Sequence, residues 1–220
     1  MKRTLINWLG LLGVISLLSY AAAVVFSPLA YPGYDWMSRA VSDLSAANAP
    51  SLGLWTQLSA FYGLCGIACV TLVSVYVQDK LSRGLRIGIH LFTIMQWVSG
   101  VGYSMFPLTD AGYTEAASDA FDAMTSMFTN YQDAGHIVVT VLVMVLSVIS
   151  LLFMMINGFR KKRYSSLALC ATVAFVMMMI GGIGTGIVPN DVFGVVQRIS
   201  LLSATGFTAV LGVYLFNGFR

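Results

Sequence analysis

The chain has 220 residues, of which 58% are hydrophobic and only 10% are charged. Soluble domains carry about 25% charged residues, so this composition excludes an ordinary water-soluble domain. The net charge is +3, but the basic residues lie in short segments between apolar stretches, where membrane orientation and lipid headgroups account for them. We therefore expect membrane lipids as partners and no nucleic acid.

Six apolar stretches follow one another along the chain. A helix that crosses a bilayer needs about 20 apolar residues, and each stretch reaches or approaches that length. The first exceeds the apolar core of a signal peptide, which spans about 7 to 15 residues, so we expect it to remain as a membrane anchor. The pattern predicts one all-α domain over residues 1–220 with six transmembrane helices, at 5–26, 54–77, 87–106, 136–159, 167–188 and 199–216.

The charged residues separate by sign between the two ends of these stretches. Ten of the twelve Lys and Arg residues lie at one set of ends, and eight of the nine acids lie at the other, with Asp79 as the exception. By the positive-inside rule the basic side is cytoplasmic, so both termini are expected inside. Two arginines break the pattern, because Arg39 and Arg198 lie among the acids on the outward side.

Both long outward segments are expected to carry a short helix on the membrane surface. In the first, at 27–53, three aromatic residues between positions 31 and 36 favour the headgroup layer. Asp35, Arg39 and Asp43 follow at intervals of four, so one helix would hold the arginine between two carboxylates. In the second, at 107–135, residues 117–128 combine an apolar face with an acidic one.

Most ionisable groups on the outward side lie at one membrane level, next to the ends of spans. His136 opens the fourth span shortly after Asp133, and Asp110 follows the third span. Helices of one bundle bring such groups together, which predicts a polar layer that binds a small ligand. Its expected members are Arg39, Asp43, Asp110, His136, Gln197 and Arg198.

Two of these residues have more than one interpretation. His136 beside carboxylates can act as a general base, with Ser42 or Ser45 as nucleophile and Asp110 as orienting group, or it can simply satisfy loop backbone at a helix end. No nucleophile-elbow glycine pattern surrounds either serine. Arg198 is either a strut that ties the outward loops to the bundle or a clamp for an anionic ligand.

The remaining polar and small residues indicate packing. The three cysteines, Cys65, Cys69 and Cys170, lie inside apolar stretches and are expected to remain reduced. A zinc site at His136 would need at least two carboxylates, since no second histidine lies on that side, so we expect no metal and no cofactor. Glycines near the outward ends of the third and fifth spans favour close helix packing over an unwound segment.

Four short runs follow in chain order: SRAVSDLS at 38–45 before Pro50, FPLTD at 106–110, GH at 135–136 and GVVQRI at 194–199. Across nearly the whole chain these runs resemble the domain of unknown function 998 family. The resemblance implies a small, multi-pass protein of a prokaryotic cytoplasmic membrane with about six helices. This chain departs in its long stretch between Asp110 and His136, and in Gln197, where an acid often precedes the arginine. An ion pair at Arg198 would then need another partner, such as Asp43 or Asp110.

The activity of that family is not established, so function rests on the outward polar layer. We expect a non-enzymatic role in which this layer binds or passes a small polar or amphiphilic, lipid-like molecule. The alternatives are a membrane-embedded hydrolase that uses His136 and Asp110, and a structural or regulatory membrane subunit whose loops contact another protein. An open cavity among these groups favours binding or catalysis, whereas fully paired groups favour a structural role.

Overall fold

The structure is a computed structural model that describes residues 3–109 and 130–219. These residues form α-helices and short 3-10 helices, and they contain no strand, so the predicted all-α class is confirmed. The elements are α1 (Leu5–Leu9), α2 (Leu12–Phe26), η1 (Ser27–Ala30), η2 (Ser42–Ser45), α3 (Leu52–Leu58), α4 (Tyr62–Tyr76), α5 (Arg83–Met105), α8 (Tyr131–Phe159), η3 (Lys162–Tyr164), α9 (Ser165–Gly184), η4 (Asn190–Val192) and α10 (Phe193–Phe216).

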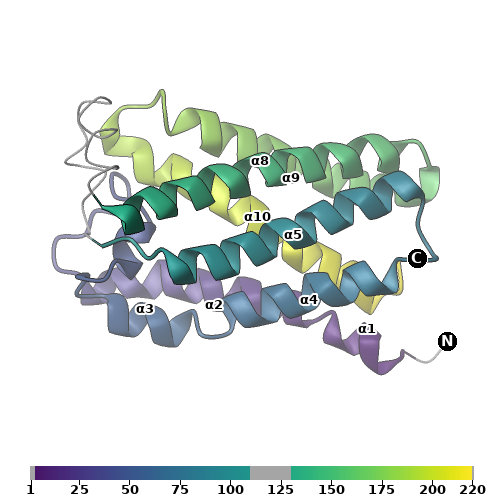
Figure 1. Cartoon of the computed structure of the whole chain (residues 1–220), viewed down its shortest axis with the longest axis horizontal. Coiled ribbons are helices and arrows are strands. Elements are labelled where there is room, and N and C mark those ends of the chain that lie inside the picture. The colour runs from purple at the N-terminus through teal and green to yellow at the C-terminus, as the bar shows by residue number, and fades with distance from the viewer. Residues whose placement is uncertain (1–2, 110–129, 220) are drawn as a thin grey trace.

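Long helices that follow one another in the chain pack side by side and close into a ring. α4 packs between α2 and α5, α8 packs between α5 and α9, and α10 follows α9 and returns to α2 (Figure 1). Short connections favour antiparallel neighbours at α4–α5, α8–α9 and α9–α10. The ring positions residues from distant parts of the sequence around one interior.

Five helical segments among the described residues are long and apolar enough to cross a membrane: Leu5–Ala30, Leu52–Tyr76, Tyr131–Phe159, Lys162–Gly184 and Asn190–Phe216. The remaining predicted span, α5, is about 35 Å long at 1.5 Å per residue. It is less apolar than the others because it carries polar residues that face inward, and its Thr93, Gln96 and Ser99 are buried. The chain is a multi-pass membrane protein with five to six such helices.

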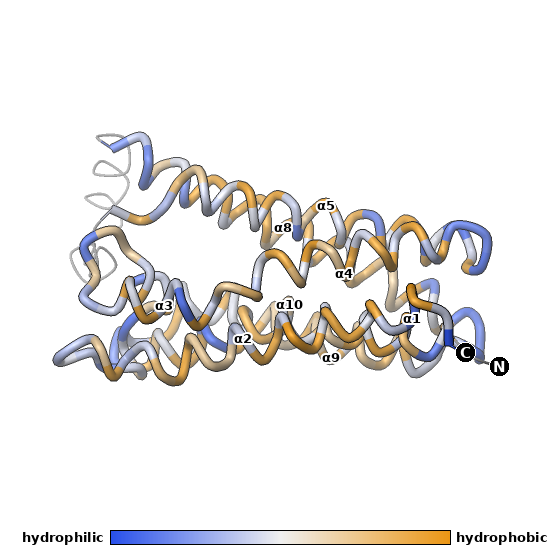
Figure 2. The backbone as a smooth tube through the Cα atoms, turned by 90° about the horizontal axis from the view of Figure 1, so that it is seen from below, coloured by the Kyte–Doolittle hydropathy of each residue, from blue (hydrophilic) through white to orange (hydrophobic). Residues whose placement is uncertain are grey.

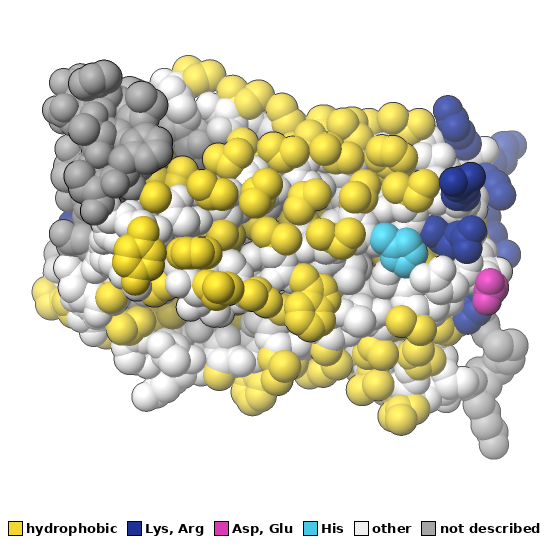
Figure 3. Space-filling model, viewed as in Figure 1, with side chains coloured by type: hydrophobic (Ala, Val, Ile, Leu, Met, Phe, Trp, Pro, Cys, Tyr) yellow, Lys and Arg dark blue, Asp and Glu magenta, His cyan; other side chains and the backbone are white. Residues whose placement is uncertain are grey.

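The two ends of the bundle differ in charge. At one end, which we call the basic end, Arg3 donates to the Phe216 carbonyl and Arg163 to the Phe219 carbonyl. Lys and Arg side chains gather there, and apolar side chains cover much of the surface between the ends (Figure 3). Both termini lie at that end (Figure 1). The opposite loop end holds residues 27–51, where the Ala47 N–H donates to the Leu108 carbonyl.

The half of the bundle near the basic end is a filled apolar core. The rings of Phe92 and Phe207 meet edge to face with centroids 5.3 Å apart. Fully buried side chains of five helices surround them, including Val70, Leu85, Ile89, Leu151, Met154, Leu167 and Leu211. Toward the loop end, α5 and α8 spread away from α2 and α10 (Figure 2), so the interior there is packed differently.

The second span is interrupted at membrane depth, which its apolar composition did not indicate. α3 ends at Leu58 and α4 begins at Tyr62. The Ser19 hydroxyl donates to the Leu58 carbonyl at 2.5 Å, and the Ser16 hydroxyl donates to the Tyr62 carbonyl at 2.7 Å. Backbone groups released inside a bilayer must find partners within the protein, and these two serines of α2 supply them.

The glycines of the third and fifth spans mostly allow close packing, as expected. A Cβ at Gly102 would lie 2.6 Å from a Val139 methyl carbon, and one at Gly181 would overlap the Ser200 Cβ. α9 stays helical through Gly184, so the fifth span is not unwound in its middle. Small residues let helix backbones approach within a membrane.

The first outward segment does not form the helix that the spacing of Asp35, Arg39 and Asp43 indicated. Residues 31–41 are turns and bends, Gly33 has a φ of +75°, and only the short 3-10 helix η2 follows. The reason is tertiary, because α10 binds this backbone from the side, as described below. The helix predicted over 117–128 lies outside the described residues.

Candidate functional site

Arg198 ties the first outward segment to the start of α10. Its Nη1 donates to the carbonyl oxygens of Trp36 at 2.7 Å, Gly194 at 2.8 Å and Arg39 at 3.2 Å. Its Nη2 donates to the Tyr34 hydroxyl at 2.7 Å. The hydrogen bonds therefore go to carbonyls and a tyrosine rather than to the carboxylates that the sequence suggested. This arrangement supports the strut interpretation.

Two neighbours extend the same attachment. The Tyr34 hydroxyl donates to the Ala40 carbonyl at 2.7 Å, and the Gln197 side-chain oxygen accepts from the Val41 N–H at 2.8 Å. Burial raises the pKa of Tyr34 despite the nearby Arg198, which keeps the hydroxyl protonated and able to donate. We call these contacts of Tyr34, Gln197 and Arg198 with residues 36–41 the loop lock.

Arg39 and Asp43, both predicted to bind a ligand, belong to the same loop. The Arg39 guanidinium lies 5.1 Å from the centre of the Tyr31 ring, and Asp43 is fully buried in η2. At the loop surface, hydrogen bonds from the Ser38 hydroxyl and the Met37 N–H lower the pKa of Asp35, so this carboxylate is ionised at neutral pH. None of Arg39, Asp43 and Arg198 lines the cavity described next.

A cavity of about 710 Å³ lies inside the loop half of the bundle, below the loop lock. Sites for small molecules commonly have volumes of about 300–1,000 Å³, so the space is large enough for one. Residues of α2, α3, α4, α5, α8, α9 and α10 contribute to its wall. Of the sequence-predicted residues, Ser42, Ser45, His136 and Gln197 line it. We call it the outer cavity.

The wall of the outer cavity combines apolar surface with uncharged polar groups. Among the described residues that line it, none is Asp, Glu, Lys or Arg. Its aromatic and polar members include Tyr20, Ser42, Trp55, Tyr62, Gln96, Ser99, Tyr103, His136, Thr140 and Gln197. An isolated charge is expensive to bury, so this wall suits an uncharged ligand.

Hydrogen bonds around His136 determine which atoms remain for a ligand. Its Nδ1 lies 3.0 Å from the Phe106 carbonyl oxygen, which can only accept, so Nδ1 carries the hydrogen. In the neutral ring Nε2 is then an acceptor. The Thr140 hydroxyl donates to the His136 carbonyl at 2.8 Å, so the Tyr103 hydroxyl, 3.0 Å away, must donate to Thr140. The Tyr103 oxygen also keeps acceptor capacity.

Asp133 was one of the carboxylates predicted beside His136, but it bonds to Thr109 and Asn130 at the start of α8 instead. Its carboxylate accepts from the Thr109 N–H at 2.9 Å, the Thr109 hydroxyl at 2.7 Å and the Asn130 amide at 3.0 Å. Asn130 also caps the helix by accepting from the Gln132 N–H. Asn130 thus satisfies a backbone donor at the helix start, and Asp133 joins that start to Thr109, so both groups have structural roles.

The hydrolase alternative stays a prediction, and the structure supports only part of the arrangement that it needs. Ser42 and His136 share the outer cavity, but the orienting bond of the His136 ring goes to the Phe106 carbonyl rather than to a carboxylate. Asp110, the predicted orienting group, lies outside the described residues. General-base geometry needs a hydroxyl within reach of the ring nitrogen, which the shared wall alone does not establish.

Several lining residues escaped the sequence interpretation, although one signal pointed to them. Gln96, Ser99 and Tyr103 recur on α5 at intervals of three and four, which is the spacing of one helix face. The Gln96 amide donates to the Thr208 hydroxyl at the inner limit of the cavity. Polar residues on one face of a span indicate that this face points into the bundle. Tyr20 and Tyr62, on other spans, belong to no such polar face, so the sequence did not indicate them.

The cysteines and His90 make contacts within the bundle. Within ranges 3–109 and 130–219, no group of three or more His, Cys, Asp or Glu side chains is placed to hold a metal ion. Cys65, Cys69 and Cys170 are free thiols, and the Cys69 sulfur lies 3.7 Å from the Gly10 carbonyl oxygen. His90 bonds to Ser74 through Nδ1 and lies 3.1 Å from the Gln78 amide through Nε2, a structural role.

Comparison with known proteins identifies one family. The model of a family described as protein of unknown function (DUF998) matches residues 14–214, nearly the whole chain. No curated protein matches the chain. No solved structure matches it either.

Proposed function

The chain belongs to the DUF998 family, whose function is unknown, and within it we propose that this protein binds an uncharged amphiphilic molecule in the outer cavity. A hydroxyl-bearing head would donate to His136 Nε2 and the Tyr103 oxygen. The apolar body would lie against the aliphatic side chains of α8 and α9. No chemical change of the ligand is part of this proposal.

The observation that carries the proposal is the combination of cavity size and lining. A space of about 710 Å³ within membrane-spanning helices is lined by apolar and uncharged polar side chains. A solely structural bundle would be expected to fill such a volume, as it does near the basic end, because interiors pack densely. The loop lock supports the same interpretation, since it satisfies Arg198 without using the cavity.

We also propose that the loop end faces the outside of a prokaryotic cytoplasmic membrane and that both termini are cytoplasmic. The basis is the positive-inside rule applied to the basic end. The cavity would then lie in the outer leaflet half of the bilayer. A cysteine in place of the exposed Ala47, in the first outward segment, should react with a membrane-impermeant maleimide in intact cells. A cysteine in place of Arg160 should react only after lysis, and the reverse pattern would refute this orientation.

Binding is measured with 1-monoolein as an uncharged, hydroxyl-bearing probe. The full chain is placed in phosphatidylcholine nanodiscs with graded mole fractions of monoolein, and native mass spectrometry counts the bound molecules. We expect saturable binding. Oleic acid and oleylamine, which have the same chain and charged heads, should bind at least about tenfold more weakly, because none of the described lining residues is Asp, Glu, Lys or Arg.

A histidine variant tests the polar contact. His136→Asn keeps an amide donor near the Nδ1 position and removes Nε2, so monoolein affinity should fall roughly three- to tenfold, the value of one hydrogen bond. His90→Asn makes the same change outside the cavity and should leave the affinity unchanged. Absence of saturable monoolein binding to the unmodified chain would reject the proposal and favour the structural or regulatory subunit.

A further inference from the structure

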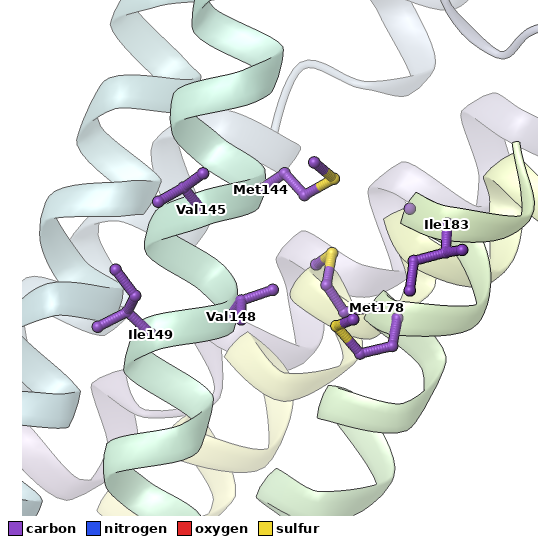
Figure 4. A pocket seen from close by; sticks show the side chains of 8 residues that line it. Met144, Val145, Val148, Ile149, Met178 and Ile183 are labelled. Atoms are coloured by element: carbon purple, nitrogen blue, oxygen red, sulfur yellow. The ribbon is translucent and has the colours of Figure 1, made fainter. Parts of the chain in front are cut away.

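A second, smaller hollow lies between α8 and α9 and is entirely apolar. Its volume is about 220 Å³, and the described residues that line it are Met, Val, Ile and Gly only. We call it the α8–α9 groove (Figure 4). The residues used below are Met144, Val145 and Ile149 of α8, and Met178, Gly182 and Ile183 of α9.

The groove lies on a surface that faces lipid. Val145 is 45% exposed, Ile149 39% and Ile183 53%, and the two helices belong to segments long and apolar enough to cross a membrane. A groove with no polar partner does not hold ordered water. Hydrocarbon chains are the molecules that surround it and that match its surface.

The groove and the outer cavity meet at shared residues. Met144, Met178 and Gly182 line both spaces. In Figure 4 the Met144 side chain extends from α8 toward α9, and Met178 lies on the facing helix. A Cβ on Gly182 would lie only 2.8 Å from the Met144 sulfur, so the passage between the helices is narrow. We call these three residues the neck.

The neck residues suit a passage that opens and closes. Methionine is unbranched and flexible, so its thioether can move aside and refill a gap at low cost. Glycine at position 182 leaves the space that the Met144 sulfur occupies. A branched aliphatic pair would instead close the contact permanently, since its side chains have few alternative conformations.

We propose that the α8–α9 groove is a lateral opening through which the amphiphile reaches the outer cavity from the bilayer, its hydrocarbon chain remaining in the groove. This inference rests on the proposed function and names the ligand class more narrowly, as a single-chain lipid with an uncharged head. The head reaches the polar groups near His136, and the chain crosses the neck into the membrane. One molecule thereby fills both hollows.

The test uses two photoreactive monoacylglycerols in nanodiscs with the full chain. One carries a diazirine beside the glyceryl head, the other at the end of its acyl chain, and both are added from donor vesicles before illumination. The head probe should label residues of the outer cavity around Tyr103 and His136. The chain probe should label α8 between 144 and 149 and α9 between 178 and 183.

Variants of the neck should change the rate in opposite directions. Gly182→Val places a branched side chain against the Met144 sulfur and fills the passage, so it should slow labelling by the head probe at least about tenfold. Gly206→Val makes the same substitution on α10, where a Cβ meets no other atom within 4 Å, and should not slow it. Met144→Ala widens the neck and should accelerate labelling. Opposite effects of the two variants would show that the rate follows the width of the neck, which a folding defect would not produce.

The outcomes separate this inference from the proposed function. If the head probe labels the outer cavity at the same rate in Gly182→Val and in the unmodified chain, the ligand arrives by another route and the lateral opening is refuted. If the head probe labels no cavity residue even in the unmodified chain, the proposed function fails. Cross-links from the groove to a second copy of the chain would show a protein interface instead, which also overturns the inference.

Discussion

Arg198→Ala should lower the free energy of unfolding by about 3 kcal/mol, because it leaves partly buried carbonyl oxygens without a donor at about 1–3 kcal/mol each, and water can replace part of the lost bonding at this half-buried position. The change removes the donors for three carbonyl oxygens and the Tyr34 hydroxyl together. For a chain of this size the unfolding midpoint should fall by roughly 10 °C. Thermal unfolding in detergent, followed by circular dichroism, measures both.

Two further arginine variants make this result specific. Arg198→Lys keeps the charge but not the planar fork, so it should restore less than half of the lost stability. Arg163→Ala removes an arginine at the basic end whose hydrogen bond to the Phe219 carbonyl is 3.5 Å long, and should change stability by no more than about 0.5 kcal/mol. Unchanged stability of Arg198→Ala together with lost monoolein binding would identify Arg198 as a ligand clamp and contradict the strut.

Gly194→Ala should destabilise the protein by about 3 kcal/mol, at the upper end of the usual cost of overpacking. A Cβ at this position would overlap the Arg39 carbonyl oxygen and would lie 2.6 Å from that of Trp36. Both are main-chain atoms that Arg198 holds in place, so they cannot move away without breaking the loop lock. The same thermal unfolding experiment measures the loss.

The matched control variant, Gly206→Ala, should change the stability in the opposite direction. Gly206 lies on the same helix, and a methyl group added there would meet no other atom within 4 Å, so Gly206→Ala adds only helix propensity. It should stabilise the protein by about 0.5–1 kcal/mol. If both alanine variants shift the unfolding midpoint in the same direction, the close approach of the loop backbone is not the reason for glycine at position 194.

The loop lock and the outer cavity divide the outward polar residues into two groups with different tasks. Arg198, Tyr34 and the amide of Gln197 hold backbone, whereas His136, Tyr103 and Ser42 line the outer cavity. The sequence placed Arg198, Gln197 and His136 at one membrane level without separating them. Gln197 contributes to both groups, because it binds the Val41 N–H and also lines the cavity.

The spans and the charge asymmetry can be read from the sequence because the bilayer imposes them locally. Each span must be apolar over about 20 residues and must satisfy its own backbone, so composition within one stretch suffices. Helices cover each of the six predicted stretches, although α5, α8 and α10 begin about one turn or more before the predicted starts, and α5 is the least apolar because its polar face points inward. The break at 59–61 was not foreseen, since it depends on serines of another helix.

The partners of individual side chains depend on contacts between segments far apart in the chain, which no local pattern encodes. The acids on the outward side suggested a carboxylate partner for Arg198, but the folded loop presents carbonyl oxygens to it, and Gly194 permits their close approach. The outer cavity arises in the same way, because it depends on how far α5 and α8 stand from α2 and α10. Residue order therefore specifies which segments lie in the membrane, while packing between helices determines where a space for a ligand remains.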